Sequence, residues 1–468
     1  MNNLKPYTKY KPSGIAWLGD IPEHWEERRI KYFFREIDNR SETGDEDLLS
    51  VSHYTGVTKK RDRLAENEMI SNAKTLVGYK IVEKGDLVIN IMLAWNGSLG
   101  ISKFNGITSP AYCVYRSLIG GEKYFGYLFR TKEAQQEFKK QSTGIIDSRL
   151  RLYTDKFFNI KTVIPTPEEQ TAIARFLDYK LAKINRFIQK KKQLIKLLNE
   201  QKAAIINQAV TKGLDANVKM KPSGIEWLGD IPEHWEVKPI KYFVTCNDES
   251  LTDKTDKDYQ LRYIDIGNVD SNGNVSEIVS YKFNDAPSRA RRIVKEGDII
   301  VSTVRTYLKA IMHINGDSEN LIVSTGFAVL RPRKNVRSEF LNYAIRANYF
   351  IGKVVSESNG VSYPAINSTE LITLKIAIPI VDEQKKIVQF IDSETEIINT
   401  TISKIEKELA LVEEYKTALI AEAVTGKIDV RNYEIPTITE PETYDELEDE
   451  LYIAAEDEPE YQNEDVEE

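Results

Sequence analysis

Cysteine is scarce in this sequence of 468 residues. Its two cysteines, Cys113 and Cys246, lie far apart and form no CxxC pair, which excludes a disulfide framework and argues against a cysteine-rich zinc site. Apolar runs are short as well: none approaches the ~18 consecutive residues of a membrane span, and the residues after Met1 lack the apolar core of a secretion signal. We therefore expect a folded protein of the reducing cytoplasm.

The short motifs of common enzymes are also missing. The sequence contains no phosphate-binding P-loop, no GxSxG and no HExxH, and no GxGxxG opens a helix after a strand. It has no Asn-Pro-Pro-aromatic or Asp-Pro-Pro-aromatic motif to hold a flipped adenine for methylation. We therefore predict that the chain is not an enzyme and holds no cofactor and no metal of its own.

Only four histidines occur, and two of them occupy one repeated position. His24 and His234 each stand before a tryptophan in a Pro-Glu-His-Trp motif. A catalytic histidine pair is therefore poorly supported, and we expect these two side chains to pack or to form hydrogen bonds.

Charge is distributed unevenly along the chain. The net charge is -8, but residues 433–468 hold 16 acidic residues and no lysine or arginine, so residues 1–432 carry +8. A segment this acidic cannot bury enough surface to offset its chain entropy. We expect an acidic, disordered tail over residues 429–468 and a basic body before it.

An internal duplication organises that body. Lys11–Phe34 recurs as Lys221–Val244 with 5 differences in 24 positions, and Ile160–Asp178 returns in similar form as Leu374–Asp392. Residues 35–159 and 245–373 between these blocks have diverged, although Glu83–Val88 still matches Lys295–Ile300 in pattern. Two repeats of this length are too few and too long for a solenoid, so we predict two related globular domains with pseudo-two-fold symmetry.

The diverged segments indicate mixed α/β structure. Strands are expected at Leu87–Ile91, at Ile299–Val304, where the same strand region would carry Arg305 and Tyr307, and at Phe327–Leu330. Helices are expected at Lys123–Lys140 and Ser338–Val354. The Asn272-Gly273 pair predicts a hairpin between Ile264–Ile266 and Val275–Ile278.

Each repeat closes with a long helix. Thr166 and Asp382 are the expected N-caps, and apolar residues step mainly by three, four or seven along both segments. The pattern predicts that the two helices pair in a coiled coil, with surface helices lying on their own domains as the alternative. The expected seam is formed by Ile173, Leu177, Ile184, Ile188, Ile195, Leu198, Ile205 and Ala209 with Ile387, Ile391, Ile398, Ile402, Ile405, Leu409, Val412, Leu419 and Ala423.

The fold class is therefore α+β, with two duplicated mixed α/β domains joined by the coiled coil. The predicted boundaries are residues 1–165 for the first domain, 166–212 for its helix, 213–379 for the second domain, 380–428 for the second helix and 429–468 for the tail.

Clustered positive charge with aromatic and turn-forming residues is the candidate binding chemistry. Basic clusters contact phosphates, and Arg, Asn and Ser on loops can read base edges, although a single cluster is more often a solvated surface. Matched placement in both repeats favours DNA binding, and the Gly360 loop of the second repeat corresponds to the Gly144 loop of the first. The candidate DNA-binding residues are Tyr54, Lys59, Lys60, Arg61, Arg63, Ser148, Arg149, Arg151, Tyr153, Arg289, Arg291, Arg292, Arg305, Tyr307, Ser362 and Tyr363.

Three features together resemble the specificity subunit of a type I restriction-modification enzyme. They are the Pro-Ser-Gly-Ile-Glu-Trp-Leu-Gly-Asp-Ile-Pro-Glu-His-Trp block at Pro222–Trp235, the Ile-Pro-x-x-x-Glu-Gln start of each long helix, and the duplication. Tyr263–Asn268 with Gly273 also resembles the family's early strand pattern, from which Leu49–Tyr54 departs. The resemblance covers residues 1 to about 430.

This resemblance implies two target recognition domains that each read one half of a split double-stranded DNA sequence. It implies that a long antiparallel two-helix coiled coil separates the two domains. It implies two modification subunits that methylate adenine with S-adenosylmethionine, and restriction subunits that translocate and cut DNA with ATP and magnesium. None of those active sites is expected on this chain. The alternative from another class is a coiled-coil interaction scaffold whose paired domains bind acidic proteins, and a self-sufficient methylating nuclease is disfavoured by the missing motifs.

Overall fold

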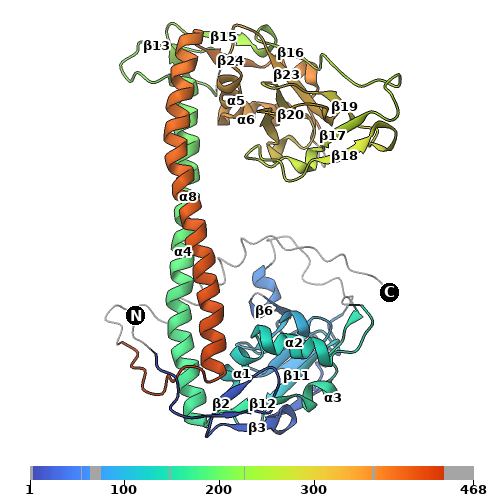
Figure 1. The fold of residues 1–468 in the computed structure, drawn as a ribbon, viewed down its shortest axis with the longest axis vertical. Coiled ribbons are helices and arrows are strands. Elements are labelled where there is room, and N and C mark those ends of the chain that lie inside the picture. Colours follow the sequence, from blue (N-terminus) through green and yellow to red (C-terminus); the bar gives the residue numbers. More distant parts are fainter. Residues whose placement is uncertain are drawn as a thin grey trace. The chain divides into compact units, whose positions relative to one another are not determined.

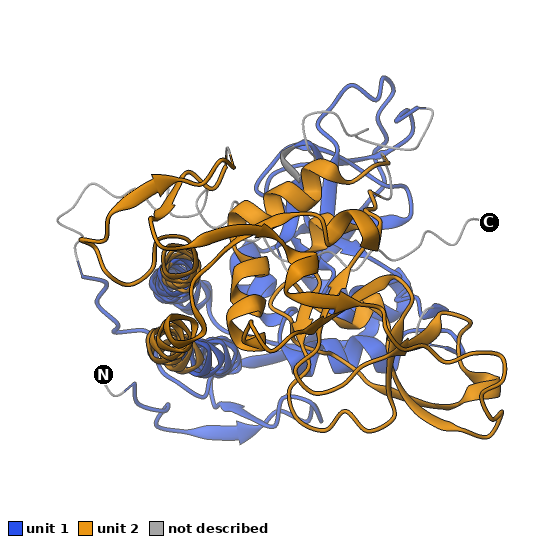
Figure 2. Ribbon diagram, turned by 90° about the horizontal axis from the view of Figure 1, so that it is seen from above, with its two compact units in different colours: residues 1–193, 406–468 blue, residues 194–405 orange. Residues whose placement is uncertain are grey.

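The computed structural model describes residues 4–53, 55–63, 75–146, 149–225, 227–360 and 364–436. The chain forms two compact units, residues 1–193 with 406–468 and residues 194–405 (Figure 2). Each unit therefore contains a part of each long helix. Within the described ranges, no helix is long and apolar enough to cross a membrane.

The first unit is built mainly from short antiparallel strands. Its central sheet has the order β4-β11-β8-β9, and three short helices follow β11 (Figure 1). The strands are β1 Tyr10–Pro12, β2 Asp20–Pro22, β3 Glu26–Arg29, β4 Phe34–Ile37, β5 Leu49–Ser52, β6 Gly56–Lys59, β7 Lys80–Val82, β8 Leu87–Asn90, β9 Leu99–Ile101, β10 Gly106–Thr108, β11 Tyr112–Ser117 and β12 Lys161–Ile164. The helices are α1 Glu122–Leu128, α2 Lys132–Gln141, α3 Thr154–Asn159 and the first part of α4 Pro167–Lys212.

The second unit repeats this plan. Its sheet β16-β23-β20-β21 has the same order of equivalent strands, and a second sheet, β18-β17-β22-β19, replaces the β5–β6 hairpin and the β7–β10 pair of the first unit. The strands are β13 Met220–Pro222, β14 Asp230–Pro232, β15 Glu236–Pro239, β16 Val244–Cys246, β17 Gln260–Ile264, β18 Val279–Lys282, β19 Ala290–Ile293, β20 Ile299–Ser302, β21 Ile311–His313, β22 Leu321–Ser324, β23 Phe327–Pro332 and β24 Lys375–Ile378. The helices are α5 Ser338–Arg346, α6 Asn348–Glu357, α7 Ser368–Leu371 and α8 Val381–Val424.

The predicted helix seam is confirmed. In the first unit Ile173 and Leu177 share a core with Leu419 and Ala423, and in the second unit Ala209 shares one with Ile387 and Ile391. The amino-terminal part of α4 therefore packs against the carboxyl-terminal part of α8, and the reverse holds at the other ends, as antiparallel pairing requires. None of the predicted seam positions is exposed.

The repeated helix-start motif has a structural explanation. In each unit the motif glutamate accepts a hydrogen bond from the motif histidine, at 2.8 Å for His24 with Glu169 and 2.8 Å for His234 with Glu383. The following glutamine, Gln170, donates to the carbonyl oxygen of Pro165 at 2.9 Å, as its counterpart does in the second unit. The expectation that the two histidines form hydrogen bonds is confirmed.

The repeated Gly-Asp turn before β8 and β20 also has a structural role. Asp86 is buried, accepts a hydrogen bond from the Glu83 backbone at 2.8 Å and holds Arg116 of β11 through two bonds of 2.8 and 2.9 Å. Asp298 holds Arg331 of β23 through bonds of 2.9 and 2.8 Å. The carboxylate thus fastens a turn to the neighbouring strand in both repeats.

Several sequence predictions need correction. The expected helix Lys123–Lys140 is interrupted because Thr131 adopts an extended conformation and caps α2, and Ser338–Val354 is interrupted at Ala347 in the same conformation. Asp382 is not an N-cap, since the carbonyl of Ile380 already accepts the helical bonds of residues 383 and 384.

The predicted hairpin of the second repeat is confirmed only at its turn. The Gly273 amide donates to the Asp270 carbonyl at 3.0 Å, and one bridge joins Val269 and Val275. The longer ladder lies elsewhere, between β17 and β18.

The chain after α8 continues to pack against the first unit. Val430 is 2% exposed, and the ring centroid of Tyr433 lies 4.9 Å from that of Phe176. Residues 429–433, which the sequence assigns to the tail, are therefore part of this unit. Residues 437–468, where the acidic tail is predicted, lie outside the described residues.

Candidate nucleic-acid interface

Two loops lie together at the same end of the central sheet in each unit. In the first unit they are the connection between β8 and β9 and the Gly144 loop, and the Leu152 amide donates to the Ile91 carbonyl at 2.9 Å. In the second unit the β20–β21 connection meets the Gly360 loop, with an Ile366 to Thr303 bond of 2.9 Å. The predicted correspondence of the two glycine loops is therefore confirmed.

The bases of the glycine loops are fixed in the same way. Thr143 and Arg151 exchange two backbone hydrogen bonds of 2.9 and 3.0 Å, and Asn359 and Ala365 exchange two of 2.9 Å. Gly144 has a φ of 156°, and a Cβ there would lie 2.5 Å from the Arg149 carbonyl oxygen. The loop can therefore vary at its tip while its base stays closed.

The tip of the first unit's loop faces solvent. At the tip, Ile145 is 100% exposed, Ile146 is 53% exposed and Arg149 is exposed. Arg151 at the base is half-buried, and Tyr153, which follows the base and precedes α3, is 47% exposed. Exposed apolar and basic side chains on an anchored loop suit contacts with base edges and phosphates. Ser148 lies outside the described residues.

The cluster at Lys59 differs from this loop in its surroundings. The Lys59 ammonium lies 2.9 Å from the Asp47 carboxylate and 5.5 Å from the centroid of the Phe104 ring. The hydrogen bond from Lys59 is the main cause that holds the pKa of Asp47 below its usual value. Lys60 is half-buried and Arg61 is exposed, so Arg61 is the better placed of the three for a phosphate.

The remaining candidates of that cluster lack described side chains. Tyr54 lies outside the described residues, and of Arg63 only the backbone, in a short 3-10 turn at Lys60–Arg63, is described.

In the second unit the structure brings Arg289 to the β20–β21 connection. The Thr325 amide donates to the Arg289 carbonyl at 2.9 Å, and the next residue, Gly326, accepts from Thr303 at 2.9 Å. Arg289 and Arg305 are both exposed, and these backbone bonds link the segments that carry them. Their shared position is consistent with a common polyanionic ligand.

The other two arginines of this cluster have partners within the protein. The Arg291 guanidinium lies 4.7 Å from the Phe283 ring centroid, and Arg292, half-buried on β19, donates to Ser250 Oγ at 3.4 Å. Both contacts hold the arginines against their own sheet. Ser362 and Tyr363 lie outside the described residues.

The expectation that a strand carries Arg305 and Tyr307 is wrong. Strand β20 ends at Ser302, and Thr306–Leu308 forms a 3-10 turn preceded by Arg305 with a φ of 49°. A left-handed backbone cannot continue a strand. Tyr307 is 50% exposed, and the buried Thr306 holds the turn through a 2.8 Å hydrogen bond between its hydroxyl and that of Ser358.

Sequence reasoning missed several residues at this end of the two units. The first unit presents Trp95, Asn96 and Lys139, whose ammonium lies 4.9 Å from the centroid of the Trp95 ring. The second presents Leu308, which is 45% exposed, and Lys309. Extending the match of Glu83–Val88 with Lys295–Ile300 along the sequence at the same spacing would have aligned both connections and found all of these residues except Lys139, which lies on α2.

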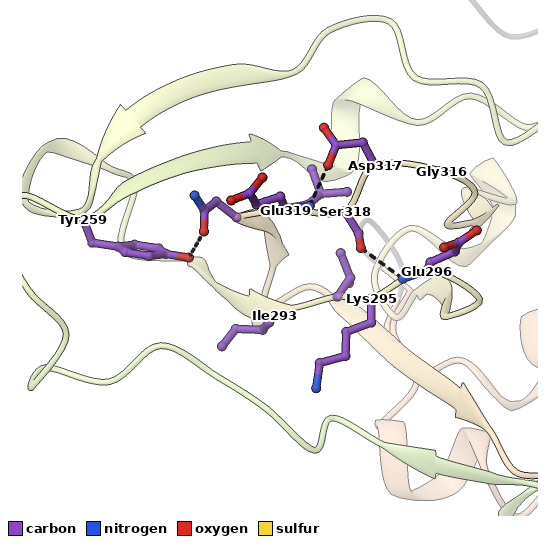
Figure 3. Close-up of a pocket in the computed structure, with 11 residues that line it drawn as sticks. Tyr259, Ile293, Lys295, Glu296, Gly316, Asp317, Ser318 and Glu319 are labelled. Atoms are coloured by element: carbon purple, nitrogen blue, oxygen red, sulfur yellow. Dashed lines mark hydrogen bonds between the residues drawn. The ribbon is translucent and has the colours of Figure 1, made fainter.

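An open hollow in the second unit does not suit DNA. It has a volume of about 630 Å³ and is lined by residues that include Tyr259, Lys295, Glu296, Asp317 and Glu319 (Figure 3). Three carboxylates line it against one lysine, and that lysine forms an ion pair with Glu249. Phosphates would be repelled there.

Comparisons with known proteins agree with this picture. The family model described as "Type I restriction modification DNA specificity domain" matches residues 22–197 and 232–410, once in each repeat. The MjaVIII type I restriction enzyme specificity subunit of Methanocaldococcus jannaschii is 27% identical over 431 residues, covering 88% of this chain and 95% of the relative. The HindI specificity subunit of Haemophilus influenzae is 32% identical over 155 residues, covering 29% of this chain and 33% of the relative.

A solved structure has the same fold. It is described as the structural basis underlying complex assembly and conformational transition of the type I R-M system, and its chain matches with a TM-score of 0.60 and 14% identity, covering 86% of this chain and 98% of that one. Because the family model matches both repeats over more than half of the sequence, this chain belongs to the type I restriction modification DNA specificity domain family.

Proposed function

We propose that this chain is the DNA-specificity subunit of a type I restriction-modification complex and binds a bipartite double-stranded target. The observation that carries the proposal is that two copies of one anchored loop pair present different side chains. A shared framework with diverged tips is what two readers of different sequences need. The basic body, with a net charge of +8 over residues 1–432, supports the phosphate contacts.

Two readers also make physical sense. A single domain contacts few base pairs, and each mismatch costs only about 1–3 kcal/mol. Two readers acting on one DNA molecule multiply their discrimination, because their free-energy penalties add. One reader alone would bind too many sites in a genome.

The chemistry belongs to partner proteins in this proposal. Two modification subunits would methylate adenine with S-adenosylmethionine, and restriction subunits would move and cut DNA with ATP and magnesium. The absence of nucleotide-binding and methylation motifs from the sequence supports this division. The chain itself would bind DNA and position those partners, as a protein without catalytic activity.

Selection from randomised duplex DNA tests the proposal. We expect the full chain, alone or with its modification subunits, to enrich a sequence with two specified halves and an unspecified gap. Replacing residues 245–373 with the same segment of a relative should change one half and leave the other intact.

A salt titration separates this function from the scaffold alternative. Affinity for random duplex should fall steeply as salt rises, because bound phosphates release counterions. Absence of binding even at low salt would refute DNA recognition and support a scaffold for acidic proteins.

A further inference from the structure

The connections that follow β8 and β20 match residue for residue. Ala94 and Thr306 are the buried members of the two 3-10 turns, and Asn96 and Leu308 both stand two residues after them. The turns end at Gly97 with a φ of 80° and at Lys309 with a φ of 56°. The two turns therefore end in the same way, whereas the residues before them differ: Leu93 has a φ of -125° and Arg305 a φ of 49°.

Two residues of the second connection adopt a conformation that side chains disfavour. Arg305 and Lys309 both have positive φ values, of 49° and 56°. Non-glycine residues rarely occupy this region. Such conformations persist only where the surrounding structure enforces them, and they cluster at functional sites. Here the Thr306–Ser358 hydrogen bond and the Ile366–Thr303 backbone bond enforce it.

The two matched tips carry different chemistry. Asn96 is exposed, and within the described ranges no hydrogen bond of its side chain is found. Leu308 is 45% exposed at the corresponding position. One tip thus presents an amide, whereas the other presents methyl groups.

We propose that Asn96 and Leu308 are matched base-reading residues, Asn96 for an adenine in one half of the target and Leu308 for a thymine methyl in the other. This inference rests on the proposed function. In the major groove adenine presents the N6 amino group as a donor and N7 as an acceptor. The asparagine amide can pair with both, because its oxygen accepts from N6 and its NH₂ group donates to N7. A leucine can only make an apolar contact, for which the thymine methyl is the partner in the major groove.

The surroundings fit this assignment. Strands β8 and β9 pair antiparallel at one edge of the four-stranded sheet β4-β11-β8-β9, so the connection that carries Asn96 lies at an end of that sheet, where a polar side chain can reach base edges in the major groove. Beside the tip, the Lys139 ammonium lies over the Trp95 ring, and an exposed lysine at the edge of a base contact can also approach a phosphate. Asn96 is uncharged, so its contribution should depend on sequence rather than on salt.

Selection from randomised duplex with full-length variants tests the inference. For Asn96→Ala we expect loss of one adenine preference in one half and about 5- to 150-fold weaker binding to the wild-type target, with an unchanged salt slope. Asn96→Leu should shift the same position toward thymine. Leu308→Asn should change one position of the other half toward adenine.

Lys84→Ala is the matched control. Lys84 is exposed in the turn that precedes β8, at the opposite end of that strand, so the selected sequence should not change. Thermal unfolding of Asn96→Ala should match the wild type, because the Asn96 side chain is exposed and forms no hydrogen bond with the part of the chain that the structure describes.

The outcomes separate this inference from the proposed function. If the wild type selects a bipartite sequence but the Asn96 and Leu308 variants select the same one, the assignment is overturned and the function stands. A uniform loss over all sequences, or an unstable Asn96→Ala, would also overturn it by assigning a phosphate contact or a structural role. If the wild type selects no sequence, the proposed function fails.

Discussion

Replacing Asp86 with alanine tests the Gly-Asp turn that both repeats retain. The Asp86 side chain is 2% exposed, and Arg116, at 29%, keeps a second contact with Glu83 at 2.9 Å. The substitution removes both Asp86–Arg116 hydrogen bonds and the acceptor of the Glu83 amide. A half-buried guanidinium would be left with one partner.

The magnitude follows from this geometry. Removing one partner of a buried ion pair costs about 3–5 kcal/mol, and the remaining Glu83 contact argues for the lower end, about 3 kcal/mol. Domains are stable by about 5–15 kcal/mol, so the loss is a large fraction of the total. For a unit of this size it corresponds to a fall of roughly 6–12 °C in the unfolding midpoint.

Urea and thermal unfolding of the full chain would measure the change. Asp298→Ala is the matched variant, because Asp298 makes the corresponding bonds to Arg331 and to the Lys295 amide, the latter at 2.8 Å. We expect similar losses, in the first unit for Asp86→Ala and in the second for Asp298→Ala, as resolved by hydrogen exchange. A loss below about 1 kcal/mol in both would refute the assigned role of the carboxylate.

Three further predictions concern binding, length and pH. Arg151→Ala and Arg305→Ala should each lower the affinity for DNA. The loss should be confined to some sequences if the arginine reads bases, and uniform with a shallower salt slope if it contacts phosphate. Unchanged affinity in both variants would show that neither arginine contacts DNA. Adding one heptad at equivalent seam positions of α4 and α8 lengthens each helix by about 10 Å, so the unread gap in the DNA target should grow by about two to three base pairs. A folded, active variant with the same gap would show that helix length does not set the gap. Burial lowers the pKa of His313 below its usual 6.5, against the opposing influence of Glu339. Because the unfolded chain then binds the proton more readily than the folded chain, the free energy of unfolding should fall as the pH drops below about 6.5. Unfolding measured over a range of pH should show a smaller fall for His313→Gln.

The parts of the fold that repeat or have a strong period were predictable from the sequence. The seam of α4 and α8 follows from apolar spacing, because a long paired helix has to bury the same face in every turn. The duplicated blocks predicted two domains of one plan, because repeats that keep histidine and glutamate at matched positions can form the same hydrogen bonds, as His24–Glu169 and His234–Glu383 do.

The local breaks were not predictable from those patterns. The apolar period continues through Lys123–Lys140, yet Thr131 takes an extended conformation that starts a new helix. The run Ile299–Val304 has strand propensity throughout, and nothing in it reveals that Arg305 turns left-handed. Such single-residue conformations depend on tertiary contacts like the Thr306–Ser358 bond, which local sequence does not encode.

Clustered positive charge in the sequence predicted some residues of the candidate site and missed others. It found Arg289 and Arg305, which are exposed on segments that backbone hydrogen bonds link, but it also selected Lys59 and Arg291, whose charges contact groups of the protein itself. It passed over Asn96 because a lone exposed asparagine carries no pattern. Only the alignment of the two repeats gives that residue a counterpart.

In each unit buried residues hold the turns and loops in place, whereas the exposed residues at the loop tips differ between the repeats. Substitutions in these two groups should therefore have different effects on stability. Asp86, Asp298 and Thr306 are at most 4% exposed, so changing them should cost stability, whereas the residues at the tips mostly contact solvent and should change at little cost, since surface substitutions usually fall within about 0.5 kcal/mol. Target preference can therefore diverge between repeats while the framework stays almost identical. The sequence shows this division even inside the diverged segments 35–159 and 245–373, where both repeats keep the Gly-Asp turn of Asp86 and Asp298 while Asn96 and Leu308 differ.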